Sequence, residues 1–76
     1  MGYRGLMDRK GEQFAYLYGN TLYTLEDEAT GRLQGDFIVD MEGNRMWRVE
    51  GDAVYSLDRS ETVGYFGEER PGRFDV

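Results

Sequence analysis

The sequence contains no cysteine and no histidine, and it has only one proline and one lysine. Without cysteine the chain can form neither a disulfide nor a thiolate zinc site. Without histidine it lacks the commonest general base and the commonest transition-metal ligand. Its 76 residues allow one small domain, and a chain of this size buries only roughly 60 % of the surface that it exposes when unfolded. Stability therefore has to come from apolar packing and backbone pairing, with self-association as a further source.

Long apolar runs and clustered positive charge are also missing. No apolar stretch approaches the roughly 20 residues that a membrane-spanning helix needs, so we expect no membrane contact. Nine basic and fifteen acidic side chains give a net charge of −6, which disfavours direct binding to the phosphates of a nucleic acid. The lack of cysteine fits a cytoplasmic protein, and this is the expected location.

What the sequence has in abundance is repetition, with a period close to 16 residues. Four triplets stand in the same phase: Leu6-Met7-Asp8, Leu22-Tyr23-Thr24, Ile38-Val39-Asp40 and Val54-Tyr55-Ser56. A glycine followed by Asn, Asp or Glu recurs with the same step: Gly19-Asn20, Gly35-Asp36, Gly51-Asp52 and Gly67-Glu68. A fixed period of this kind indicates a repeated supersecondary unit.

The glycine-containing turns predict which residues face one another. Glycine at the first of two central positions permits the positive φ of a type II′ hairpin turn, and a two-residue turn fixes the register of the strands on either side. The pairs expected in the core are Leu17 with Leu22, Leu33 with Ile38, and Val49 with Val54. The pairs expected on the opposite face are Tyr16 with Tyr23, Arg32 with Val39, and Arg48 with Tyr55.

A looser turn is expected half a repeat away from each tight one. The two clearest have the Asp and Gly of a type I turn followed by a bulge, and they are Asp8-Arg9-Lys10-Gly11 and Asp40-Met41-Glu42-Gly43. The other two match the pattern of this turn less closely, and they are Leu25-Glu26-Asp27-Glu28 and Ser56-Leu57-Asp58-Arg59. The fourth unit is one residue longer here, because Val63-Gly64-Tyr65-Phe66 lags the register of Phe14-Ala15-Tyr16-Leu17 by one.

The two ends of the array lack strand partners and complement each other in phase. Pairing the strand of Leu6 with the strand of Phe66 closes the array and removes both edges. The predicted fold is therefore all-β, with four pseudo-repeated hairpins of about 16 residues closed into a shallow eight-stranded barrel or ring. The domain is expected over residues 1–68. A flexible C-terminal tail is expected over residues 69–76, where Pro71-Gly72 breaks any strand.

On these motifs the chain resembles the four-fold β-flower family, in which hairpins are arranged as petals around a shallow barrel. The segments that carry the resemblance are Asp8-Arg9-Lys10-Gly11, Phe14-Ala15-Tyr16-Leu17, Asp40-Met41-Glu42-Gly43 and Val63-Gly64-Tyr65-Phe66, with the tight turns. It covers about residues 6–69. Trp47 departs from the pattern, because the matching positions are the small residues Ala15, Gly31 and Gly64. The resemblance implies a fold but no reaction and no ligand.

The side chains that carry chemistry fit turns better than catalysis. Asp8 and Asp40 fall in equivalent positions, and paired carboxylates can do acid–base work, but Asp also starts turns of this type. Ser56 has no histidine as a base. A circle of Asn20, Asp36, Asp52 and Glu68 could attract Ca²⁺, yet these residues also suit the turn backbone. We expect no enzyme activity, no metal and no cofactor.

The leading functional hypothesis is a non-enzymatic binding or assembly module. It contacts a protein partner, or a second copy of itself, through a surface that carries aromatic and arginine side chains. The residues expected to form this surface are Trp47, Tyr55, Tyr23, Arg32 and Arg48. Trp47 is expected either to fill the centre of the ring or to project towards a partner, because it replaces a small residue.

Two alternatives come from charge and geometry. The net charge of −6 in so short a chain suits an acidic decoy that occupies a basic or nucleic-acid-binding surface of a partner protein, as small viral inhibitors can. Such binding weakens steeply as salt is added. A third hypothesis is a receptor for a small ligand or ion in the centre of the ring, for which replacing Asp36 and Asp52 is the discriminating change.

Overall fold

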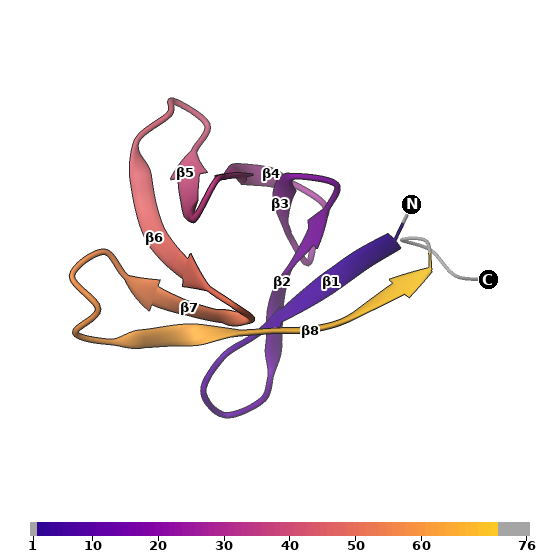
Figure 1. The fold of residues 1–76 in the computed structure, drawn as a ribbon. Helices are drawn as coiled ribbons and strands as arrows, with labels where there is room; N and C mark the ends of the chain where they lie inside the picture. The colour runs from indigo at the N-terminus through magenta and orange to yellow at the C-terminus, as the bar shows by residue number, and fades with distance from the viewer. Residues whose placement is uncertain (1, 72–76) are drawn as a thin grey trace.

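The computed structural model describes residues 2–71 of the chain. Regular structure within this range consists of eight β-strands: β1 (Gly2–Met7), β2 (Gln13–Tyr18), β3 (Thr21–Thr24), β4 (Ala29–Gln34), β5 (Phe37–Asp40), β6 (Arg45–Glu50), β7 (Ala53–Ser56) and β8 (Thr62–Pro71). Each strand pairs antiparallel with its neighbours in sequence, and β1 also pairs with β8, so the sheet is a closed barrel (Figure 1). The predicted all-β, eight-stranded closed fold is confirmed. Within the described range no helix is long and apolar enough to cross a membrane.

The register predicted from the tight turns is also confirmed. The structure places opposite each other Leu17 and Leu22, Leu33 and Ile38, Val49 and Val54, Tyr16 and Tyr23, Arg32 and Val39, and Arg48 and Tyr55. Across the seam between β1 and β8, Leu6 stands opposite Phe66. The turn chemistry thus fixes the pairing within each hairpin, and the phase of the repeat fixes the pairing of the two ends.

Three of the four tight turns adopt the predicted backbone. Gly19, Gly35 and Gly51 have φ angles of 64°, 61° and 63°, and the residue after each has no positive φ. This is the φ pattern of a type II′ turn. The fourth prediction is wrong, because Gly67 and Glu68 lie within β8 rather than in a turn. At this position the ring is closed by β1, so no chain reversal is needed there.

Each tight turn also bonds to the next repeat. The carbonyl oxygens of Asn20, Asp36 and Asp52 accept hydrogen bonds from the amides of Leu33, Val49 and Phe66, at 2.8, 2.7 and 2.7 Å. The three donors occupy equivalent positions in successive units, so the contact recurs around the ring. Neighbouring hairpins are therefore locked together by backbone groups that would otherwise lie unpaired at the turns.

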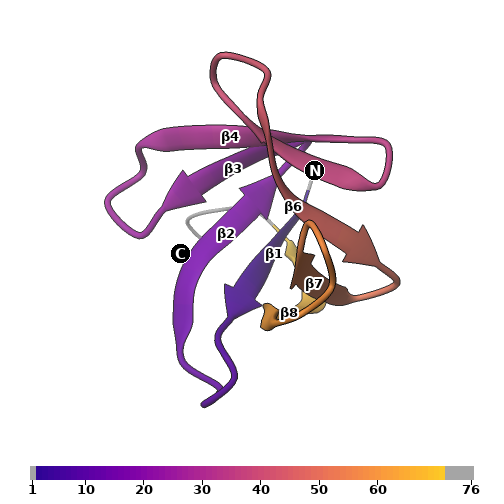
Figure 2. The same cartoon turned by 90° about the vertical axis from the view of Figure 1, so that its left-hand side faces the viewer.

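The looser turns form four loops that point outwards in different directions (Figure 2): loop 1 (residues 8–12), loop 2 (24–28), loop 3 (40–44) and loop 4 (56–61). Each is closed by a hydrogen bond from the amide of its first residue to the carbonyl of its last, at 2.8 to 2.9 Å. Loop 4 is one residue longer than the others, since Ser56 N bonds to Glu61 O, and this confirms the predicted insertion.

Loop 2 begins one residue earlier than the sequence predicted. The amide of Asp27 donates to the carbonyl oxygen of Thr24 at 2.9 Å, so the turn runs from Thr24 to Asp27 and not from Leu25 to Glu28. Asp27 has a φ of 70° and occupies the position of Gly11 in loop 1. The prediction was wrong because an Asp in this left-handed conformation replaces the expected glycine.

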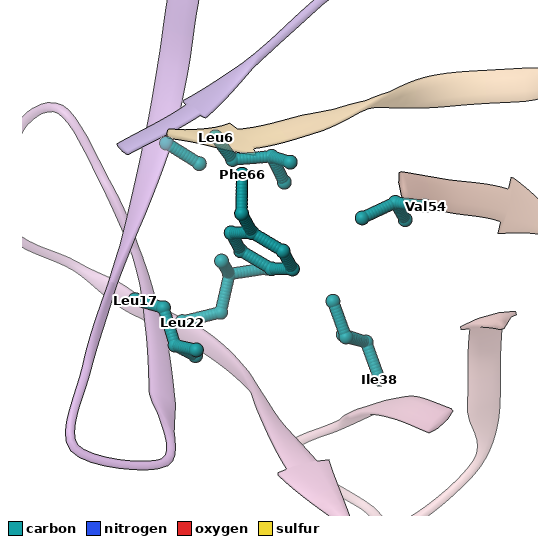
Figure 3. Packing of buried hydrophobic residues seen from close by; sticks show 7 residues of the cluster. Leu6, Leu17, Leu22, Ile38, Val54 and Phe66 are labelled. Atoms are coloured by element: carbon teal, nitrogen blue, oxygen red, sulfur yellow. The ribbon is translucent and has the colours of Figure 1, made fainter. Parts of the chain in front are cut away.

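The core consists of two rings of four apolar side chains, one from each repeat. The inner ring is Leu6, Leu22, Ile38 and Val54, and all four are buried. The second ring is Leu17, Leu33, Val49 and Phe66. Leu33 and Val49 are only half-buried, while the ring of Phe66 extends into the space between the other side chains (Figure 3). One large residue in the second ring thus fills the centre that aliphatic side chains would leave open.

The expected boundary after residue 68 differs from the structure. β8 continues to Pro71, and its last residues pair with the start of β1: Arg4 with Glu69, Tyr3 with Arg70, and Gly2 with Pro71. Proline is tolerated here because it ends the strand. The rest of the expected tail, residues 72–76, lies outside the described residues.

Candidate functional site

The outer face of β4 to β7 carries three arginine side chains together with two aromatic ones. Two rows of cross-strand partners cross it. In the first row Val39 stands between Arg32 and Arg45, and in the second row Arg48 stands between Phe37 and Tyr55. Cross-strand partners share one side of a sheet. We call this surface the arginine face: Arg32, Phe37, Val39, Arg45, Arg48 and Tyr55.

Phe37 is the centre of the arginine face. The guanidinium carbon of Arg45 lies 4.1 Å from the centroid of the Phe37 ring, and that of Arg48 lies 5.0 Å from it. Two cations therefore share one aromatic ring, each within the range of a cation–π interaction. Arg48 is held further by a hydrogen bond from its Nε to the carbonyl oxygen of Leu57, at 3.4 Å.

Val39 forms the apolar floor of the same surface. Its side chain is only 3 % exposed, yet it does not belong to the central cluster of the barrel. Its cross-strand neighbours are Arg32 and Arg45, whose aliphatic stems can cover apolar surface while the charged heads stay in water. The arginine face thus combines an apolar floor with three charged groups.

The charges of the arginine face have no carboxylate partner within residues 2–71. The ion pairs in this range join Arg4 to Asp52 at 2.7 Å and Arg59 to Glu50 at 2.6 Å. Guanidinium groups stacked on a ring keep their N–H edges available for a planar, two-pronged hydrogen bond to a carboxylate or phosphate. In a chain with a net charge of −6, this face is a local concentration of positive charge that could accept an anionic group.

Tyr23 lies in a separate aromatic cluster on the neighbouring strands. Its ring stacks on Tyr16 at 5.2 Å between centroids, and Tyr16 meets Tyr3 edge to face at 6.0 Å. The Tyr16 hydroxyl donates to a carboxylate oxygen of Asp27 in loop 2 at 2.5 Å. This cluster packs β1, β2 and β3 together and fixes loop 2, and it does not share the rows that form the arginine face.

Trp47 lies on the core side of β6, opposite to Arg48. It pairs across the strands with Ile38 and Ser56, and it is half-buried against the central cluster. The structure places Trp47 on the inward side, where it packs against the central cluster, but the centre itself is occupied by Phe66 (Figure 3). Of the five residues predicted for the binding surface, the structure therefore brings together Arg32, Arg48 and Tyr55, and it places Tyr23 and Trp47 elsewhere.

Two members of the arginine face, Phe37 and Arg45, were missed by sequence reasoning. A signal for both was present in the repeat. The positions equivalent to Phe37 hold Gly5, Thr21 and Ala53, so a large aromatic residue stands where the other units have small ones. Arg45 likewise replaces uncharged residues in the other units. Departures from the repeat would have identified them.

The conspicuous aspartates serve as turn anchors. In loop 1, Oδ1 of Asp8 accepts hydrogen bonds from the amides of Lys10 and Glu12, at 2.8 and 3.0 Å, and Asp40 does the same in loop 3. These bonds lower the pKa of Asp8, chiefly through the Glu12 amide, and that of Asp40, chiefly through the Asn44 amide. A carboxyl that is kept ionised in this way is poorly suited to donate a proton as a general acid.

In loop 4 different side chains accept the loop amides, and the pKa of the carboxyl group is again lowered. The pKa of Asp58 is lowered to about 2 by hydrogen bonds from Ser60, first from its hydroxyl and then from its amide, and from the Ser56 hydroxyl. The Ser56 hydroxyl donates to Asp58 at 2.8 Å and accepts from the amide of Glu61 at 3.1 Å. Ser56 thus takes part in loop closure.

The predicted circle of turn residues is not a cluster of ligands. Asp52 is paired with Arg4, and Glu68 lies in β8. Within residues 2–71 no group of three or more acidic side chains is close enough together to hold a metal ion.

Comparison with known proteins identifies no relative of this chain. The chain matches no family model, no curated protein and no solved structure. The resemblance to the four-fold β-flower family therefore stays a prediction, and any function has to be argued from the site itself.

Proposed function

We propose that this protein is a non-enzymatic binding module that recognises an acidic segment of a partner protein through the arginine face. The observation that carries the proposal is the stacking of both Arg45 and Arg48 on Phe37. Their guanidinium groups have no carboxylate partner within residues 2–71. Aromatic and arginine side chains are also the residue types most enriched at protein interfaces.

The arrangement favours binding because it is already ordered. Stacking on Phe37 restricts both arginine side chains, and the bond from Arg48 to Leu57 restricts one of them further. Less rotamer entropy is then lost when a carboxylate binds. Tyr55 is half-buried beside Arg48 and supplies a rigid aromatic edge with a hydroxyl. A partner segment with acidic side chains next to an apolar one fits this surface.

The proposal is tested by NMR titration with an acetylated tetraglutamate peptide as the probe. We expect saturable shifts of the Arg45 and Arg48 Nε–H signals. Replacing one guanidinium (Arg45→Gln or Arg48→Gln) should weaken binding by roughly 10- to 100-fold, because one charge-assisted hydrogen bond contributes about 1.5–3 kcal/mol.

The matched control is Arg70→Gln, which removes an exposed arginine on β8, away from the arginine face. Binding should be unchanged by this substitution. If Arg70→Gln weakens binding as much as Arg48→Gln does, the probe responds to net charge alone and the proposal is wrong. Equal binding of tetraglutamate to the wild type and to the Arg45→Gln/Arg48→Gln variant would also contradict it.

The second candidate function is the acidic decoy, and the distribution of charge supports it. Acidic side chains outnumber basic ones by fifteen to nine, and the ion pairs of Glu50 with Arg59 and of Asp52 with Arg4 engage two of the basic ones. A partner with a basic surface would meet an excess of negative charge. This function predicts binding to a basic probe such as oligolysine that weakens steeply with salt and is not reduced by Arg45→Gln.

A further inference from the structure

The outward loops share an exposed apolar residue at one position. It directly follows the first residue of the loop and is Leu25 in loop 2, Met41 in loop 3 and Leu57 in loop 4, with exposed fractions of 55 %, 50 % and 40 %. The second position of a type I turn accepts most residues and has no need of an apolar one. Three large apolar side chains at equivalent exposed positions are therefore available for contacts with another molecule.

Loop 1 breaks this pattern and carries the opposite feature. Its equivalent residue is Arg9, followed by Lys10, the single lysine of the chain. Together with Asp8 and Val63, these residues line an open depression between loop 1 and the start of β8. The depression thus joins the apolar Val63 to two positive charges, and the carboxylate of Asp8 in its lining is already bonded to amides of loop 1.

Loop 2 is the best match to this depression in charge. Leu25 is the most exposed of the three apolar residues, and Glu26, Asp27 and Glu28 follow it directly. Loop 3 has Asp40 and Glu42 beside Met41, but the Asp40 carboxylate is already bonded within the loop. Loop 4 sets Arg59 beside Asp58. Charge complementarity therefore selects loop 2.

Loop 2 is also held in one conformation before any contact is made. The amides of Glu26 and Glu28 donate to the hydroxyl oxygen of Thr24, both at 3.2 Å, and the carboxylate of Asp27 accepts the bond from Tyr16. The side chains of Glu26 and Glu28 form no ion pair with any described residue. An ordered loop with an exposed leucine loses little entropy when it docks.

We propose that loop 2 of one copy docks into the loop 1 depression of a second copy, with Leu25 against Val63 and with Glu26 and Glu28 beside Arg9 and Lys10. In Figure 2 loop 1 points downwards and loop 2 points to the left, so the proposed contact joins two separate chains. The two surfaces differ, and the association is head-to-tail. Such a contact produces closed rings or open chains of molecules.

The test is sedimentation analysis of the wild type over a range of concentrations. The contact area is small, so we expect weak association, with the average mass rising above the 8.8 kDa of one chain between about 10 μM and about 1 mM. Two charge reversals, Arg9→Glu/Lys10→Glu and Glu26→Lys/Glu28→Lys, should each weaken association at least about tenfold. An equimolar mixture of the two variants should associate again, because each charge-reversed surface then meets an oppositely charged one.

The mixture separates this contact from a general effect of charge. Loss of association in both variants without recovery in the mixture would overturn the proposal, and so would a wild type that stays at 8.8 kDa at every concentration.

Both charge reversals should preserve the loops, because Lys10, Glu26 and Glu28 enter the turn hydrogen bonds through backbone groups. If a reversal still unfolds the chain, Leu25→Ser provides a second test, with monomer as the expected result and unchanged association as the contradicting one. Arg45→Gln should leave association intact, so failure of this proposal is distinct from failure of the proposed function.

Discussion

Residue size at a few positions decides how closely the strands of this barrel approach one another. A Cβ atom added to Gly64 would lie 2.0 Å from the carbonyl oxygen of Met7, and one added to Gly31 would lie 2.4 Å from that of Val39. Both glycines occupy the position that holds Ala15 in the first repeat and Trp47 in the third. The backbone of the paired neighbouring strand, β1 for Gly64 and β5 for Gly31, fills the place of the missing side chain, so glycine here serves close packing.

The first prediction concerns Gly64→Ala. Because the added Cβ would meet backbone, which cannot rotate away, we expect the free energy of unfolding to fall by about 3 kcal/mol. Urea unfolding followed by the fluorescence of Trp47, the only tryptophan, measures this.

The matched control is Gly67→Ala, three positions further along β8. There the new Cβ would meet the Cε atom of Met7 at 2.7 Å, which is the end of a flexible side chain. We expect a loss below about 1 kcal/mol. Equal losses for the two variants would show that backbone contact does not explain the need for glycine at residue 64.

At the scale of elements, the four loops use different side chains for the same purpose. Asp8, Thr24 and Asp40 each accept backbone amides in loops 1, 2 and 3, and Ser56 with Asp58 does so in loop 4. In three of the four loops the acceptor is an ionised carboxylate, so these loops depend on pH.

The second prediction follows from the lowered pKa of Asp58. A carboxyl whose pKa is about 2 in the folded protein and 3.8 when unfolded stabilises the fold above pH 3.8, and this stabilisation disappears as the pH falls towards 2. The melting temperature of Asp58→Asn should therefore lie below that of the wild type at neutral pH. The difference should shrink as the pH is lowered through this window. A difference that stays constant down to pH 2 would contradict proton linkage as its cause.

The elements could be predicted from the sequence because the turn chemistry is local. Gly followed by Asn or Asp sets the strand register of three hairpins. The positions of Leu6 and Phe66 in the repeat set the pairing of β1 with β8. The start of loop 2 could not be predicted, because Asp27 takes a backbone conformation that favours glycine. The end of β8 was missed because its last residues pair with β1, which is distant in sequence.

The candidate site was less predictable than the fold, since it depends on which side of a strand each residue lies. The predicted strand pairing places Arg32, Arg48 and Tyr55 on one face, as the structure does, while their role in binding stays a prediction. Trp47 precedes Arg48 directly, so the alternation of a strand sends the two side chains to opposite faces. The stacking of Arg45 over Phe37 depends on a bulge between β5 and β6. No turn motif in the sequence predicts this bulge.

For the whole molecule, closure depends on the seam between β1 and β8, which no turn connects. Arg4 spans this seam. Its Nε donates to the carbonyl oxygen of Gly67 at 2.8 Å, its Nη2 pairs with Asp52 at 2.7 Å, and its guanidinium carbon lies 5.3 Å from the centroid of the Phe66 ring. One side chain thus ties the first strand to the last strand and to the turn between β6 and β7.

The third prediction compares the two partners of this ion pair. The side chain of Asp52 is 73 % exposed and that of Arg4 is 30 % exposed, so the ion pair itself contributes little, and Asp52→Asn should cost less than about 1 kcal/mol. Arg4→Ala also loses the bond to Gly67 and the contact with Phe66, and should cost about 2 kcal/mol. Urea unfolding of both variants measures this, and a larger loss for Asp52→Asn than for Arg4→Ala would contradict the role of Arg4 at the seam.

The position of the seam also sets the order in which the barrel can be assembled during synthesis. The hairpins β2–β3, β4–β5 and β6–β7 join strands that are neighbours in sequence, so each can form soon after it leaves the ribosome. β1 is made first, but half of its pairing requires β8, which is made last. Until then one edge of β1 is open to other chains. Newly made copies are therefore most exposed to mispairing just before the last strand arrives.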